Sequence, residues 1–128
     1  MKKIALFSAL SALVLSCSKN PFTGKNNLNF VSNSELFPSS FQQYGQFLKD
    51  NKVIAGTSEA KMVETVGIKI KTAAEKWLKA NGYEHYLDGY QWEYKLVDSK
   101  DVNAWCMPGG KIVVYTGILP ITQNEAGL

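Results

Sequence analysis

Residues 101–119 read DVNAWCMPGGKIVVYTGIL and form a distinctive stretch of the chain. It contains two apolar runs, at 102–107 and 111–116, separated by Pro108-Gly109-Gly110. Aromatic and β-branched side chains favour strands, whereas proline and glycine supply the backbone angles of a turn. We therefore expect two strands that pair antiparallel across the turn.

The segment just upstream, residues 91–98, has the alternation of a strand. Trp92, Tyr94 and Leu96 fall on one side, and mostly polar side chains fall on the other. A period of two is the pattern of a strand with one buried face. This segment adds a third strand to the expected sheet.

A helix is expected over residues 34–51. Ser34 is a candidate cap, and Pro38 falls in the first turn, where proline is tolerated. Apolar side chains recur at spacings of three and four, which is the helical period; they are Phe37, Phe41, Tyr44, Phe47 and Leu48. This spacing favours a core-facing stripe over a ligand site.

A longer helix is expected over residues 58–81, capped by Thr57 or Ser58 and ended by Asn81-Gly82. Its apolar stripe consists of Met62, Val66, Ile70, Ala73 and Trp77, widened by Val63, Ala74 and Leu78. Such a stripe predicts an amphipathic helix lying on a sheet. The elements together predict an α+β fold, with N-terminal helices packed on a small, mostly antiparallel sheet.

The N-terminus has the pattern of an export signal. Lys2 and Lys3 precede an apolar run at 4–15, which is too short to span a bilayer as a stable helix. Val14-Leu15-Ser16-Cys17 resembles a bacterial lipobox, so we expect cleavage before Cys17 and lipid on its side chain. The alternative is a plain signal peptide followed by a chance cysteine.

These features assign residues 1–16 to a lipoprotein signal peptide and 17–33 to a tether. The tether is rich in Asn, Ser, Lys and Gly, and its segment Asn20-Pro21-Phe22-Thr23-Gly24 is turn-like. We expect the protein to be lipid-anchored in the cell envelope, on a membrane surface that faces the periplasm.

Composition argues against two kinds of partner. All 14 basic residues are lysines, and nucleic-acid sites favour arginine, so no nucleic-acid partner is expected. The single histidine, His85, lies in a polar segment after the second helix, and no cysteine pair stands at metal-ligand spacing. We therefore expect this chain to bind no metal. Cys106 is expected to be either a small buried apolar residue, the commoner case, or a free thiol.

Near the C-terminus, Thr122-Gln123-Asn124-Glu125 has the form of a capping box, with threonine as N-cap and glutamate three residues later. This pattern predicts a helix that begins at Thr122. The sequence ends three residues after Glu125, which is too short for a stable helix. We expect from this that Leu128 is not a natural domain boundary.

The residues Asn103-Ala104-Trp105, Pro108-Gly109-Gly110 and the following Ile-Val strand resemble a segment of HtpX/BepA/Oma-type zinc endopeptidases, in the superfamily of the CAAX prenyl proteases. In that family this segment precedes a helix with a His-Glu-x-x-His motif, which binds zinc and supplies the general base. The resemblance implies that residues 34–128 are a zincin-like metallopeptidase domain without its zinc helix. The full-length family binds zinc, whereas this chain has no catalytic residue and is expected to be inactive alone.

The resemblance also implies a substrate site, since this segment in the family is an edge strand that pairs with an extended polypeptide. By that resemblance Asn103, Ala104, Trp105 and Cys106 line the cleft. The structural alternative is that they only form a strand and that the Pro-Gly-Gly turn only reverses the chain.

Two functions remain open. The first is the front part of a membrane-anchored zinc metalloendopeptidase that hydrolyses envelope proteins for quality control. The second is a non-enzymatic lipoprotein, with either a peptide-binding or a purely structural role.

Overall fold

The computed structural model describes residues 17–28 and 31–128. The predicted signal peptide, at 1–16, lies outside these described residues. The chain divides into two compact units, Met1–Ser32 and Asn33–Leu128, and each is described by itself. In the described part, no helix is both long enough and apolar enough to cross a membrane.

The first unit contains a small antiparallel hairpin within the range predicted as a tether. Strand β1 (Cys17–Lys19) pairs with β2 (Asn26–Leu28). The predicted turn between them is confirmed, because Asn20 Oδ1 accepts hydrogen bonds from the N–H groups of Phe22, at 2.9 Å, and Thr23, at 3.0 Å. The two strands were not predicted, because their residues are mostly polar.

The second unit is built on a mixed four-stranded sheet. Its strands are β3 (Val53–Ile54), β4 (Glu93–Val97), β5 (Ala104–Met107) and β6 (Lys111–Tyr115), in the order β3-β4-β6-β5. The antiparallel pair β5–β6 is confirmed, and β3 also pairs antiparallel with β4. The β4–β6 pair is parallel, because β5 takes the outer position and leaves the place beside β4 to β6. The predicted α+β class is confirmed.

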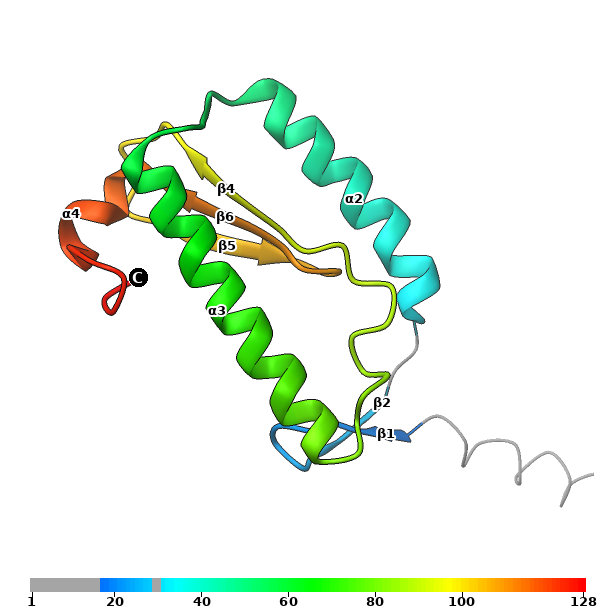
Figure 1. Ribbon diagram of the computed structural model, residues 1–128. Coiled ribbons are helices and arrows are strands. Elements are labelled where there is room, and N and C mark those ends of the chain that lie inside the picture. Colours follow the sequence, from blue (N-terminus) through cyan, green and yellow to red (C-terminus); the bar gives the residue numbers. More distant parts are fainter. Residues whose placement is uncertain (1–16, 29–30) are drawn as a thin grey trace, which may run out of the picture. The chain divides into compact units, whose positions relative to one another are not determined.

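Helices cover both faces of this sheet (Figure 1). Helix α2 (Asn33–Asp50) packs through Tyr44 on Val97 and Val113, whereas α3 (Ser58–Ala80) packs through Val63 on Leu96 and Val114. Leu96 and Val97 are neighbours in β4 and are only 2% and 1% exposed. The prediction of a half-buried strand is therefore wrong at this end of β4, which is buried on both faces.

The boundaries predicted for α3 are confirmed within a residue. Thr57 is the cap, and its side chain accepts a hydrogen bond of 3.1 Å from the N–H of Ala60. At the other end Gly82 has φ +79°, and the N–H of Tyr83 donates to the carbonyl of Leu78 at 2.9 Å. This is the hydrogen-bond pattern of a glycine-ended helix.

The face of α3 that meets the sheet differs from the predicted stripe. Val63, Gly67 and Leu78 are buried, whereas Ile70 is 57% exposed and Trp77 is 41% exposed. The reason is the packing of Tyr94, whose ring lies where a Cβ on residue 67 would be. The helix is turned so that its glycine faces the sheet, and a count of apolar residues alone does not register that position.

The end of the chain also differs from expectation. A 3₁₀ turn, η2 (Thr116–Ile118), leads into α4 (Leu119–Thr122), so Thr122 closes a helix and does not begin one. The next residue, Gln123, has φ +64°. Glu125 forms an ion pair with Lys69 of α3 and does not act as a capping residue. The capping-box prediction is wrong because the helical turn begins earlier, with Pro120 in its first turn.

Candidate functional site

Strand β5 is the outer strand of the sheet, and within residues 31–128 it pairs with β6 alone. The N–H of Tyr115 donates to the carbonyl of Asn103 at 3.1 Å, so Asn103 directs its backbone inward, toward β6. Successive residues of a strand direct their polar groups to opposite edges. The N–H and C=O groups of Ala104 and Cys106 therefore point to the outer edge.

The two faces of β5 have different surroundings. Trp105 faces α2, where its ring meets Phe47 edge-on at a centroid distance of 4.8 Å. Its Nε1 donates to the hydroxyl oxygen of Tyr115 at 3.1 Å. The Trp105 side chain therefore ties β5 to the helix on that face, which is the structural role left open by the sequence.

Ala104 and Cys106 lie on the opposite face of β5, toward α3, and both are exposed. Cys106 is a free thiol, so the expectation that burial is the commoner fate is wrong for it. The position explains the outcome: α3 packs on the inner strands β4 and β6, so side chains of the outer strand on the same face stay open to solvent.

An apolar hollow of about 140 Å³ lies between α3 and this face of the sheet. Val66 and Ile70 of α3 line one wall, and Tyr94, Ala104 and Ile112 of the sheet line another. Ala104 belongs both to the outer strand and to the hollow. The sequence placed Ala104 in a cleft by resemblance, but it gave no signal for Val66 or Ile70, which were predicted to face the core.

The turn that ends β5 is held rigidly. Gly109 and Gly110 both have φ +86°, a left-handed backbone that glycine adopts without strain. A Cβ on residue 110 would come within 2.8 Å of the ring of Trp92. The hydroxyl of Ser40 donates to the carbonyl of Pro108 at 2.7 Å, which fixes the turn to α2. The Pro-Gly-Gly segment thus sets the register of β5 as well as reversing the chain.

A buried charge lies beside this turn. Lys111 is only 6% exposed, and its Nζ lies 3.2 Å from Oε2 of Glu93 and 4.7 Å from the centroid of the Phe41 ring. An opposite charge and an aromatic face compensate part of the cost of burying an ammonium group. Burial, and secondarily the charge of Glu93, raises the pKa of the nearby Tyr44 hydroxyl well above its usual value. The α2 face is therefore tightly packed and electrostatically organised.

The family resemblance implies zinc, and the described residues do not fit a zinc site. Across 17–28 and 31–128, no three His, Cys, Asp or Glu side chains lie close enough together to hold a metal ion. His85 lies in the loop after α3, as predicted, with its Nδ1 3.1 Å from Asp88. We therefore derive no metal-dependent step from these residues.

Comparison with known proteins finds a family match for the C-terminal part of the chain. Residues 68–128, which include the outer strand and its turn, match Peptidase family M48. This match covers just under half of the chain. The expected resemblance to zinc endopeptidases is thereby confirmed for this part of the chain, whereas the lipoprotein form stays a prediction.

Curated proteins similar to this chain include metalloendopeptidases. Mitochondrial metalloendopeptidase OMA1 of Arabidopsis thaliana is 40% identical over 57 residues, which are 44% of this chain and 12% of that protein. The protein of the same name from Saccharomyces cerevisiae is 35% identical over 68 residues, or 52% of this chain and 19% of that one. The chain thus spans less than a fifth of the length of these relatives. No solved structure matches the chain significantly.

Proposed function

We propose that this chain is part of a membrane-anchored, zinc-dependent metalloendopeptidase of the cell envelope, and that its outer strand β5 binds the polypeptide substrate. Hydrolysis of envelope proteins is proposed for the whole protein, and peptide binding for the unit Asn33–Leu128. The M48 match includes β5, and the relatives are named as metalloendopeptidases.

The observation that carries the binding proposal is the outer edge of β5, to which no other strand within residues 31–128 pairs. A peptide that adds as a new strand would pair with the outward N–H and C=O groups of Ala104 and Cys106. Backbone pairing requires no particular side chain, so this edge would accept many sequences. Proteolysis of unfolded or extended proteins requires such tolerance.

The hollow beside Ala104 supports a preference at alternate positions of the peptide. Side chains of an added strand alternate between the two faces of the sheet. Those directed toward α3 would lie over the apolar surface of Val66, Ile70 and Ile112. We therefore propose that the edge prefers extended peptides with an aliphatic or aromatic residue at every second position.

The predicted site residues other than Ala104 have separate roles in this proposal. Asn103 is exposed at the start of the edge, where its side-chain amide is available to the peptide backbone. Cys106 would contribute its backbone and a small side chain, and Trp105 would hold the strand in place from the α2 face.

The binding proposal is tested with backbone-methylated peptides. Two six-residue peptides of one alternating apolar sequence carry N-methyl groups on alternate amides, in opposite phase, and binding is measured by titration calorimetry. One phase blocks the amides that face β5, and we expect it to lose about tenfold or more in affinity, whereas the other binds like the unmethylated peptide. Equal affinities for the two phases would refute strand addition.

Membrane attachment rests on Cys17 and is tested separately. We propose that lipid on this residue holds the protein on the periplasm-facing membrane surface. The full chain expressed in a bacterium with Cys17→Ser is expected to leave the detergent phase in Triton X-114 partitioning, while the unchanged chain stays in it. Cys106→Ser, which keeps the lipobox, is the matched control. If the Cys17→Ser protein stays in the detergent phase, the lipid-anchor proposal fails.

A further inference from the structure

We propose that Thr116 is a positioning residue for the peptide-binding edge, because its hydroxyl holds the loop that sets where β5 begins. The inference rests on the proposed binding function and concerns a residue outside the predicted site. Thr116 follows β6 directly and does not contact the outer edge of β5. It acts through the loop at 98–103.

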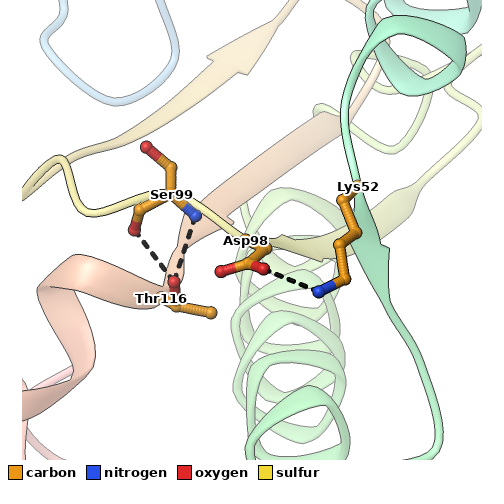
Figure 2. Close-up of polar contacts among 4 residues, drawn as sticks. All are labelled: Lys52, Asp98, Ser99 and Thr116. Carbon is orange, nitrogen blue, oxygen red and sulfur yellow. Dashed lines mark hydrogen bonds and ion pairs between the residues drawn. The ribbon is translucent and has the colours of Figure 1, made fainter.

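The hydroxyl of Thr116 bonds to both backbone polar groups of Ser99 in this loop, and we call this Thr116–Ser99 arrangement the clamp (Figure 2). The hydroxyl oxygen accepts a hydrogen bond from the N–H of Ser99 at 3.1 Å, and the O–H group donates one to the carbonyl of Ser99 at 2.8 Å. The N–H of Gly117 donates to the same carbonyl at 2.8 Å. Both backbone polar groups of Ser99 have partners here, and the Thr116 hydroxyl contacts both of them because it donates and accepts at once.

Gly117 lets the loop come close enough for this clamp. A Cβ at residue 117 would overlap the backbone carbonyl groups of Lys100 and Asp101. These are backbone atoms, which cannot rotate away as a flexible side chain would. The Thr-Gly pair that ends β6 therefore matches the shape of the loop with two features, a hydroxyl at the first position and no side chain at the second.

A chain of hydrogen bonds connects the clamp to the first residue of the binding edge. The side-chain oxygen of Ser99 accepts from the N–H of Asp101 at 3.2 Å, and the carbonyl of Asp101 accepts from the N–H of Asn103 at 3.1 Å. The carbonyl of Asn103 then accepts from the N–H of Tyr115. If Ser99 were released, Asn103 would lose one of its two restraints and would be held only by the hydrogen bond from Tyr115.

The neighbouring ion pair supplies a contrast within the same picture. Lys52 Nζ lies 2.9 Å from Oδ2 of Asp98, one residue before the clamp (Figure 2). Both side chains are exposed, at 74% and 48%, and such pairs contribute little to stability. Removing the ion pair should leave the edge in place, so Lys52→Met is the matched control for loss of the clamp.

The test compares peptide affinity with exchange of backbone amides in four proteins: wild type, Thr116→Val, Thr116→Ser and Lys52→Met. We expect Thr116→Val to bind the alternating apolar peptide roughly fivefold more weakly, which is the effect of losing about one net hydrogen bond. The N–H groups of Asn103 and Tyr115 should exchange faster in this variant. Thr116→Ser keeps the hydroxyl and should restore both measurements, and Lys52→Met should resemble wild type.

The outcomes separate this inference from the binding function on which it rests. If wild type does not bind the peptide, the proposed function fails. If wild type binds and Thr116→Val binds equally well while folded, the positioning role is overturned. Should Thr116→Val not fold, Ser99→Ala removes only the link to Asp101. A weaker affinity of Ser99→Ala then supports the inference, and an unchanged affinity overturns it.

Discussion

The two faces of the sheet give the outer strand β5 different surroundings. On the α2 face, Trp105 packs against Phe47, and Ser40 fixes the turn that follows the strand. On the α3 face, Ala104 borders an apolar hollow. One face therefore supplies the rigidity of β5, while the other leaves room for the side chains of a partner. A strand that binds by its backbone needs both, because a loose edge would have to be ordered on binding.

The largest effect is expected from removing the aromatic anchor on the α2 face. Trp105→Ala should lower the free energy of unfolding by about 3 kcal/mol, because a large ring with a hydrogen bond is lost from a packed cluster. Ile70→Ala on the open face is the control and should cost under about 1 kcal/mol, since Ile70 is 57% exposed. Urea denaturation measures both, and equal losses would show that the two faces do not differ as described.

The next effect concerns the turn. Gly110→Ala should cost about 2 kcal/mol, because alanine is strained at φ +86° and its Cβ would lie 2.8 Å from Trp92. Gly56 has a similar φ, +77°, but open space around it. Gly56→Ala should therefore cost only about 1 kcal/mol, the backbone contribution alone. Thermal unfolding is measured for both variants. Gly56→Ala reports the cost of backbone strain alone, and Gly110→Ala reports that strain together with the Trp92 contact. Equal losses of stability would exclude a role for the Trp92 contact.

Features that arise from residues adjacent in the sequence could be predicted, whereas features that depend on distant residues could not. The hairpin around Pro-Gly-Gly, the Thr57 cap and the Gly82 helix end were predicted, because each arises from residues adjacent in the chain. The face of α3 that packs on the sheet was not predicted, because it depends on the close approach of Gly67 to the ring of Tyr94, which is distant in the sequence. The short strand β3 and the parallel β4–β6 pairing arise from the path of whole segments, which local periodicity does not encode.

The candidate site shows the same division. The outer strand around Asn103 was expected through the family resemblance, and the structure places it at an edge. The clamp at Thr116 was missed, because its partner Ser99 is 17 residues away and a Thr-Gly pair after a strand has no distinctive pattern. The Thr122-Glu125 capping pattern was present, but Glu125 pairs with Lys69 of α3.

A smaller effect is expected from filling the hollow. Ala104→Leu should weaken binding of the alternating apolar peptide about tenfold and change the free energy of unfolding by less than about 1 kcal/mol, because the added side chain occupies open space. Met107→Leu, on the α2 face of the same strand, conserves volume and should leave affinity unchanged. Calorimetric titration checks the pair. Unchanged affinity in Ala104→Leu would mean that the hollow does not receive peptide side chains.

The smallest effect at neutral pH is expected at Tyr44 on the α2 face, which is 2% exposed and whose hydroxyl has no hydrogen-bond partner among the described residues. Tyr44→Phe should change stability by under about 1 kcal/mol at pH 7, because no bond is lost. Burial, then the charge of Glu93, raises the folded pKa above the usual 10.0. As pH rises above that value the unfolded state loses the proton first, so stability falls.

Phenylalanine cannot ionise, so the variant should lose less stability than wild type above pH 10. The difference in slope is expected to approach one proton, about 1.4 kcal/mol per pH unit, over the range between the two pKa values. Tyr90 and Tyr94, whose pKa values burial also raises, should keep part of the alkaline loss in both proteins. If the free energy of unfolding had the same pH dependence in wild type and in Tyr44→Phe, the Tyr44 hydroxyl would lie outside the buried cluster.

The most direct test of the account is amide hydrogen exchange, followed by NMR, at Ala104 and Cys106 with and without the alternating apolar peptide. These two outward N–H groups are expected to exchange quickly in the free protein and to become protected on binding, while the inward N–H of Trp105 changes little. If the peptide binds and neither Ala104 nor Cys106 gains protection, the peptide does not add to β5, and binding by strand addition is ruled out.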